Sequence, residues 1–160
     1  MTVERWLLAG VYVVTLVALW VVHRQEPRTV QAVFLFQQCL SWILGLLVVE
    51  VGLLEYPVRE FRIATRTSFA FEFLVFPAIA CYVNMYYPRT KDPLLKFGYY
   101  AAFASGVTVP EYFIEKYTDL IAYNGWAWYW TFISVLISLM ASRWFYNWFV
   151  AGEHGRYGGT

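Results

Sequence analysis

Five long apolar runs, separated by short polar segments, take up most of this 160-residue sequence. A helix needs about 20 apolar residues to cross the hydrocarbon core of a bilayer, which is about 30 Å thick. The runs lie at about residues 6–22, 30–54, 68–87, 95–114 and 128–149. The pattern predicts an all-α fold, an integral membrane bundle of five transmembrane helices.

The composition argues against the soluble alternatives. Hydrophobic residues make up 60% of the chain and charged residues 14%, whereas soluble domains average about 45–50% and about 25%. A soluble domain of this size could not bury so much apolar surface, because small domains have a large surface relative to their volume. The net charge of +1 and the lack of a basic patch argue against a nucleic-acid partner.

The first run has the apolar character of a secretory signal, but no small-residue cleavage site follows it; the next residues are His23 to Pro27. We therefore expect an uncleaved helix there. Residues 1–151 are predicted to form a single transmembrane helical domain, and residues 152–160 a flexible, glycine-rich tail.

Aromatic residues mark both ends of the fifth run. One group surrounds Trp126 and Trp128, and the other surrounds Trp144 and Trp148. A helix from Trp126 to Trp148 is about 33 Å long at 1.5 Å per residue. Tryptophan and tyrosine prefer the two membrane interfaces, so this spacing is typical of a helix that spans the bilayer.

Four carboxylates form a candidate polar cluster at the end of the bundle that holds the N-terminus, which we call side A. Glu50, Glu72 and Glu111 each lie about one turn from the side A end of a different predicted helix, and Glu115 shares a helical face with Glu111. Ionisable groups inside a membrane are costly and often functional. The cluster fits a structural role, in which arginine, tryptophan, tyrosine or serine donors pair with the carboxylates. It also fits an ion or proton site.

A second polar set is predicted near the opposite end, side B. It consists of Gln37, Gln38, Asn84 and Arg143. The long stem of Arg143 can reach the lipid headgroups, or its guanidinium can donate hydrogen bonds to any of the other three.

No sequence feature supports catalysis or a bound metal. The two cysteines, Cys39 and Cys81, lie in apolar runs, and no cysteine or histidine spacing matches a zinc site. Nucleophile motifs and glycine-rich phosphate loops are missing. We therefore expect no metal and no cofactor, and a function without catalysis is favoured.

Six strings give the sequence a family resemblance. They are LLEYPVREF (53–61), TSFAFEF (67–73), NMYYP (84–88), EKYTDLI (115–121), WAWYWT (126–131) and SRWFYNWF (142–149). Over about residues 30–150 the chain resembles an uncharacterised family of small multi-pass membrane proteins from spore-forming Gram-positive bacteria. The resemblance implies a location in the bacterial plasma membrane. That family has no assigned activity, so the resemblance transfers no catalytic residue.

Three functions fit these features. The first is a non-enzymatic structural or partner-binding membrane subunit with a buried polar layer. The second is a small channel or transporter that uses Glu50, Glu72 and Glu111 as an ion or proton site. The third is a membrane-embedded enzyme acting on a lipid or isoprenoid. The expected partners are the lipid bilayer and either further copies of this chain or a larger membrane complex.

Overall fold

The computed structural model describes residues 3–61 and 63–157, with side chains described for residues 4–61 and 63–150. The elements are α1 (Val3–His23), α2 (Pro27–Glu50), β1 (Leu54–Glu55), the π-helix η1 (Ala70–Val75), α3 (Phe76–Met85), α4 (Pro93–Tyr117), β2 (Ala122–Tyr123) and α5 (Trp128–Tyr157). The prediction of an all-α fold is confirmed, with one short two-stranded ladder added.

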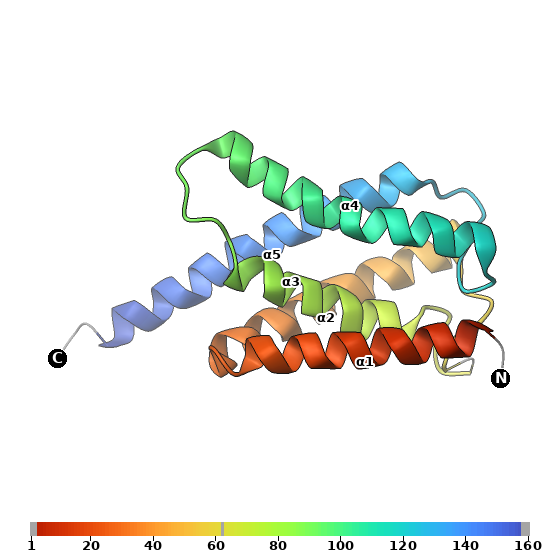
Figure 1. Ribbon diagram of the computed structural model, residues 1–160, viewed down its shortest axis with the longest axis horizontal. Coiled ribbons are helices and arrows are strands. Elements are labelled where there is room, and N and C mark those ends of the chain that lie inside the picture. The colour runs from red at the N-terminus through yellow and green to blue at the C-terminus, as the bar shows by residue number, and fades with distance from the viewer. Residues whose placement is uncertain (1–2, 62, 158–160) are drawn as a thin grey trace.

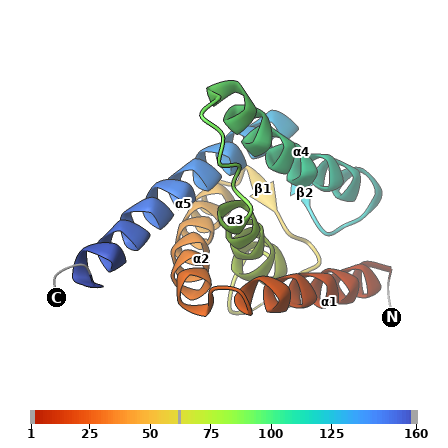
Figure 2. The same ribbon diagram turned by 60° about the vertical axis from the view of Figure 1, so that its left-hand side comes forward.

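Successive long helices run in opposite directions (Figure 1). Side A holds the N-terminal end, the segment between α2 and η1, and the segment between α4 and α5. The opposite end holds the α1–α2 and α3–α4 connections, and the C-terminal end extends beyond it. In both views α1 and α4 lie on opposite sides of α3, and α4 packs chiefly against α5 (Figure 2).

Helix α2 begins at Pro27, where proline is tolerated because the first helical N–H has no partner within the helix. The helix ends at Glu50, not at residue 54 as the apolar run predicts. Gly52 takes a φ of +78°, which disfavours other residues and turns the chain out of the helix. Leu54 then pairs with Tyr123 in an antiparallel ladder. This ladder ties together two side A segments that are far apart in sequence.

The third run contains a π-helix followed by an α-helix, with Pro77 at the start of the second part. Proline has no N–H, so a carbonyl of the preceding turn loses its partner within the helix. Two side chains of α2 bond to carbonyls of this turn: Ser41 Oγ lies 2.7 Å from the Glu72 carbonyl, and Gln38 Nε2 donates to the Phe73 carbonyl at 3.3 Å. Neighbouring helices thus satisfy the backbone around Pro77 and hold α2 against η1.

Replacing Ser41 with alanine should therefore destabilise the bundle. The change leaves the buried Glu72 carbonyl without its 2.7 Å donor, and an unpaired buried polar group costs about 1–3 kcal/mol. Ser138→Ala is the matched control, because Ser138 is also buried but bonds to Val135 of its own helix. Thermal unfolding of the purified protein in detergent measures both. Equal stability of the two variants would contradict this account of the helix contact.

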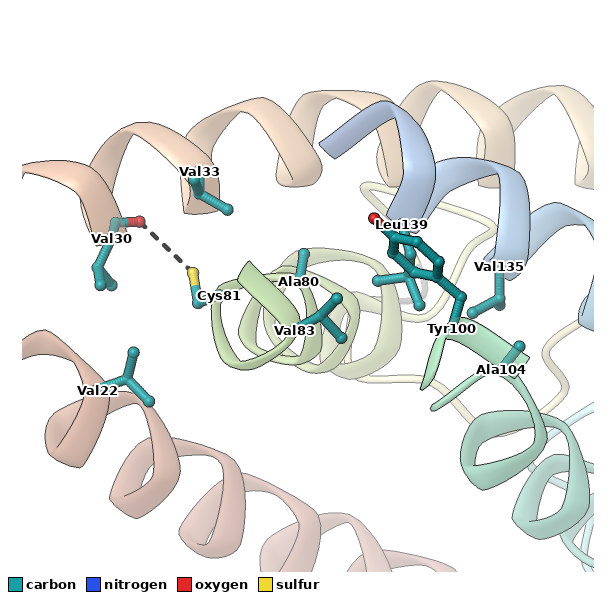
Figure 3. Close-up of a cluster of buried hydrophobic side chains, with 10 residues drawn as sticks. All are labelled: Val22, Val30, Val33, Ala80, Cys81, Val83, Tyr100, Ala104, Val135 and Leu139. Atoms are coloured by element: carbon teal, nitrogen blue, oxygen red, sulfur yellow. Dashed lines mark hydrogen bonds between the residues drawn. The ribbon is translucent and has the colours of Figure 1, made fainter. Parts of the chain in front are cut away.

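The main core surrounds α3. Figure 3 shows Ala80, Cys81 and Val83 of α3 between residues of the other four helices. The Cys81 thiol lies 3.5 Å from the carbonyl of Val30. Alanine, cysteine and valine have small side chains, which let helix backbones approach closely. Helix α3 therefore acts as the central element of the bundle.

The outer surface of the bundle is apolar and its interior holds many polar groups. Large hydrophobic side chains are exposed along α1, α2, α4 and α5, including Val14 (69%), Leu35 (62%), Phe97 (54%) and Ile137 (59%). The buried side chains include many polar ones: Gln37, Ser41, Thr67, Ser68, Glu72, Asn84, Thr108, Thr131, Ser138 and Ser142. In water this distribution would be unfavourable, because apolar burial is what drives soluble folding. Hydrocarbon around the helices would remove that cost.

Two helices of the described residues are long and apolar enough to cross a membrane by composition alone. They are Glu4–His23 and Pro27–Glu50, each with a mean hydropathy of 2.0. The apolar helix Ala70–Met85 is shorter, about 24 Å at 1.5 Å per residue. Helices α4 and α5 are long enough but do not meet the same test of hydropathy and charge.

Helix α5 continues to Tyr157, into the segment for which we expected a flexible tail. Residues 158–160 lie outside the described part of the chain.

Candidate functional site

A cavity of about 180 Å³ lies among α2, η1, α4 and α5. Its polar lining residues are Gln37, Ser41, Tyr56, Glu72, Glu111, Trp126, Thr131, Ser134 and Ser138, and the remaining walls are apolar, with Leu44, Gly45, Val48, Val49, Leu54, Phe76 and Val135. We call this space the acidic cavity. It brings Glu72 and Glu111 together, as their matching depth predicts.

Glu72 lies on η1, and its side chain is 5% exposed. The Tyr56 hydroxyl donates to Glu72 Oε1 at 3.4 Å. A Cβ atom added at Gly45 would lie 2.5 Å from Glu72 Oε1, which is too close for any side chain to fit without displacing the carboxylate. Glycine at position 45 thus lets the carboxylate lie directly against α2.

The loop that carries Tyr56 is fixed by Arg59. Its guanidinium donates to the Tyr56 carbonyl at 2.7 Å and to the Thr65 carbonyl at 2.9 Å. The arginine thereby holds the tyrosine in position for its bond to Glu72.

Glu111 lies on α4 and is held by two hydroxyl groups. Tyr123 donates to Glu111 Oε1 at 2.7 Å, and Thr131 donates to the same oxygen at 2.6 Å. The Trp126 indole N–H in turn donates to Thr131 Oγ1 at 2.8 Å. This chain of bonds joins α4, β2 and the start of α5, so Glu111 fixes the position of the second side A segment.

Among the described residues, the lining of the cavity contains two carboxylates and no lysine, arginine or histidine. Burial, followed by the charges of Glu72 and Glu111, raises the pKa of Tyr56 well above its ordinary value. Burial and the charge of Glu111 likewise raise the pKa of Tyr123. Both phenols stay protonated, so they remain hydrogen-bond donors to the carboxylates.

Gln37 places a buried amide at the wall of the cavity. Its side chain is 1% exposed and lines the cavity. Among the described residues, nothing donates a hydrogen bond to its Oε1 atom. Most buried polar atoms in proteins have a partner, so this oxygen is an unusual feature of the site. The sequence predicts Gln37 in the side B set, but the structure places it with Glu72 and Glu111.

The other two predicted side A carboxylates lie outside the cavity. Glu50 is exposed, because α2 ends at this residue and the chain turns away at Gly52. Glu115 is half-buried one turn beyond Glu111 and is not part of the lining. The structure therefore brings together two of the four carboxylates.

The side B set forms a separate network. Asn84 Nδ2 donates to Ser142 Oγ at 2.9 Å, and the Arg143 guanidinium donates to the Asn84 carbonyl at 3.1 Å. The Arg143 guanidinium also lies over the rings of Tyr87 and Tyr146, 4.2 Å and 4.5 Å from their centroids. These contacts join α3 to α5. Of the two glutamines, Gln38 bonds to η1, as described above, and Gln37 belongs to the cavity.

Several site residues escaped sequence reasoning, namely Gly45, Tyr56, Tyr123 and Thr131. Tyr56 and Tyr123 lie in or beside the two short strands, and only strand pairing brings them to the carboxylates. Gly45 lies within the apolar run of α2, where glycine weakens a helix and makes no turn. Its presence there is the one signal in the sequence that could have indicated that another side chain packs against the helix backbone.

Within the described residues, no group of three or more His, Cys, Asp or Glu side chains could hold a metal ion. Comparison with protein-family models, curated proteins and solved structures finds no match to this chain. The geometry of the cavity is therefore the basis for a functional proposal.

Proposed function

We propose that this chain is a multi-pass integral membrane protein with five spans, and that the acidic cavity binds a cation or a proton, as in a small channel or transporter. The bacterial plasma membrane, which the family resemblance implies, is the proposed location. The cavity is the single observation that carries the functional part of the proposal.

The apolar exterior supports the membrane part. Two helices meet the composition test for a span, and α4 and α5 expose large apolar residues such as Phe97 and Ile137. Polar groups of α4 and α5, including Thr108, Thr131 and Ser142, are buried inside the bundle. Those inward-facing polar residues lower the mean hydropathy of α4 and α5, but their polar groups would not contact lipid.

The site itself supports cation or proton binding. Two carboxylates share one cavity, and none of the described residues that line it is basic. Their partners there are neutral hydroxyl groups of Tyr56, Tyr123 and Thr131. Because these donors are neutral, no opposite charge among the described lining residues competes with a proton or another positive ligand for the carboxylates.

Ion flux tests this function. The full chain would be reconstituted in liposomes that contain a pH-sensitive dye, with imposed gradients of protons, Na⁺, K⁺ or alkylammonium. We expect flux from the wild type and at least a roughly tenfold loss in Glu72→Gln and Glu111→Gln, because an amide of the same shape carries no charge. Glu50→Gln is the matched control and should keep wild-type flux, because Glu50 is exposed outside the cavity. Absence of wild-type flux for every cation, or equal loss in the control, would contradict the proposal.

A structural or partner-binding subunit is the second candidate. The network of Asn84, Ser142 and Arg143 favours it, because those bonds join two helices and the space beside Asn84 has no measurable volume. On this reading both polar layers fix helix positions only, and Glu→Gln changes alter stability without altering flux.

A lipid or isoprenoid enzyme has less support. The described residues of the lining offer serine and threonine hydroxyls but no histidine, lysine or cysteine. Hydroxyl nucleophiles need an adjacent base. The hydroxyl of Thr131 has one in Glu111, but that carboxylate oxygen also accepts from Tyr123, and Thr131 Oγ1 accepts from the Trp126 indole.

A further inference from the structure

We propose that a groove between α1 and α2, at the side B end of the bundle, binds one anionic phospholipid, with its phosphate against Arg24 and Arg28 and an acyl chain along the apolar walls. This inference rests on the membrane part of the proposed function and adds a ligand at a second place. The groove shares no described lining residue with the acidic cavity.

The groove has a volume of about 380 Å³. The last two turns of α1 and the second and third turns of α2 form its walls, with Leu19, Trp20, His23, Gln31, Phe34 and Leu35. Protein cavities of about 150 Å³ hold a benzene molecule. The groove is more than twice that size, so it has room for several methylene groups of an acyl chain.

The polarity of the groove changes along its length, as the polarity of a phospholipid does. His23 and Gln31 lie toward the connection between α1 and α2, and both carry N–H donors. Leu19, Phe34 and Leu35 lie farther from that connection. A lipid whose headgroup lies at the connection would therefore place its chain against apolar walls.

Arg24 lies beside the polar end of the groove. Its guanidinium is over the ring of Trp20, 3.7 Å from the ring centroid, and Trp20 is part of the wall. The guanidinium makes no hydrogen bond or ion pair within the described residues. A guanidinium over an aromatic ring keeps its in-plane N–H donors, which match the oxygens of a phosphate.

Arg28 adds a second positive charge on the same side. Arg28, Gln31 and Leu35 share one face of α2, because side chains three and four residues apart are neighbours on a helix. Arg28 is exposed and lies one turn nearer the connection than Gln31, which lines the groove. The two arginines therefore come from both helices that form the groove.

The connection between the two helices is positively charged and fixed in place. Residues 23–29 contain two arginines and one carboxylate, Glu26, and neither arginine forms an ion pair with it among the described residues. The Gln25 amide donates to the Tyr86 hydroxyl at 2.8 Å, which ties the connection to the residue that follows α3. An anionic headgroup would thus meet positive charge that is already in position.

A lipid chain fits the groove better than a partner helix does. Helix contacts inside membranes favour small residues, which let two backbones approach closely. The groove instead exposes two large side chains, Trp20 (55% exposed) and Leu35 (62% exposed). A flexible acyl chain can follow such a surface, whereas a rigid helix would be held away from it.

Lipid binding to the purified full chain in detergent tests the inference. The probes are dioleoyl phosphatidylglycerol, dioleoyl phosphatidylcholine, whose choline adds a positive charge, and two anions without acyl chains, glycerol 3-phosphate and inorganic phosphate. Native mass spectrometry measures bound lipid, and thermal unfolding is an independent measure because a ligand of the folded state raises the Tm.

We expect phosphatidylglycerol to bind and to raise the Tm by about 4 °C or more. Phosphatidylcholine should bind at least about fivefold more weakly, because its choline would lie near two arginines. The two anions without chains should leave the Tm unchanged at equal ionic strength, since they cannot fill the apolar part of the groove.

Variants separate lipid binding from folding. Arg24→Gln and Arg28→Gln should each weaken phosphatidylglycerol binding about fivefold, the contribution of one basic residue near anionic lipid. Both arginines are exposed, so the Tm without added lipid should stay close to that of the wild type. Arg89→Gln is the matched control: it removes the same charge from the α3–α4 connection on side B, but Arg89 does not line the groove and should not affect binding.

Four results would overturn the inference. They are equal binding of phosphatidylglycerol and phosphatidylcholine, equally tight binding of an anion without chains, unchanged affinity in both groove variants, and an equal loss of affinity in the Arg89 control. A stable dimer that retains no lipid would also overturn it, because a second copy would then cover the groove.

The same measurements separate this inference from the proposed function. Cation flux that depends on Glu72 and Glu111, without any preference for phosphatidylglycerol, would overturn the lipid site and leave the proposed function standing. Selective phosphatidylglycerol binding that depends on Arg24 and Arg28, without cation flux, would support the lipid site and contradict the function proposed for the acidic cavity.

Discussion

Arginine in place of Ile137 should prevent stable membrane insertion of α5. Ile137 is 59% exposed and lies midway between the aromatic groups around Trp126 and Trp148, so we expect it at the centre of the bilayer. A central arginine costs about 2.5–3.5 kcal/mol on insertion scales, which is about a hundredfold in the insertion equilibrium. On a soluble surface the same change would stay within about 0.5 kcal/mol. Resistance of the expressed chain to alkaline extraction from membranes measures the effect.

Two controls accompany this variant. Ile137→Ala keeps the position apolar and should insert normally. Trp128→Arg places the same charge at the end of α5, where a long side chain reaches the interface, and it should insert much better than Ile137→Arg. Normal insertion and wild-type stability of Ile137→Arg would show that α5 does not face hydrocarbon.

Thr131→Val should be among the most destabilising conservative changes at the site. The hydroxyl of Thr131 donates to Glu111 and accepts from the Trp126 indole, so valine leaves both groups short of a partner. Each buried polar group without a partner costs about 1–3 kcal/mol, so we expect a loss of about 3 kcal/mol. That loss corresponds to a fall in Tm of about 6–12 °C for a chain of this size.

Thr108→Val is the matched control for this change. Thr108 is as deeply buried as Thr131, but its hydroxyl bonds to the Ala104 carbonyl of its own helix. A backbone N–H of the helix bonds to that carbonyl with or without the hydroxyl, so valine at position 108 should lower the stability only slightly. Equal Tm shifts in the two variants, measured by thermal unfolding in detergent, would contradict the role assigned to the Glu111 network.

The sequence predicts the helices well because apolar length is a local property. The predicted spans at 6–22, 95–114 and 128–149 fall within α1, α4 and α5. The error at the end of α2 has a physical cause: residues 51–54 are as apolar as the helix before them, and the pairing of Leu54 with Tyr123 overrides that local pattern. The π-helix also went unpredicted, because its backbone depends on donors from Ser41 and Gln38 of another helix.

The candidate site was predictable only in part. Counting helical turns from the side A end of each predicted helix places Glu72 and Glu111 at a similar depth, and both residues line the cavity. The same count fails for Glu50, because α2 ends earlier than its apolar run. It also fails for Gln37, because depth along one helix does not reveal which neighbour the side chain meets. The tyrosine donors come from segments whose position depends on tertiary pairing.

Labelling of single cysteines tests the membrane arrangement most directly. In a Cys39→Ala, Cys81→Ala background, cysteine would replace Glu26, Lys91, Glu55 or Asp119, all exposed positions between helices. A membrane-impermeant maleimide should reach positions 26 and 91 from one side of the membrane and positions 55 and 119 only from the other. An N-terminal tag should be accessible together with positions 55 and 119, and a C-terminal tag together with positions 26 and 91. Labelling of all four positions from one side of intact membranes would contradict the five-span account.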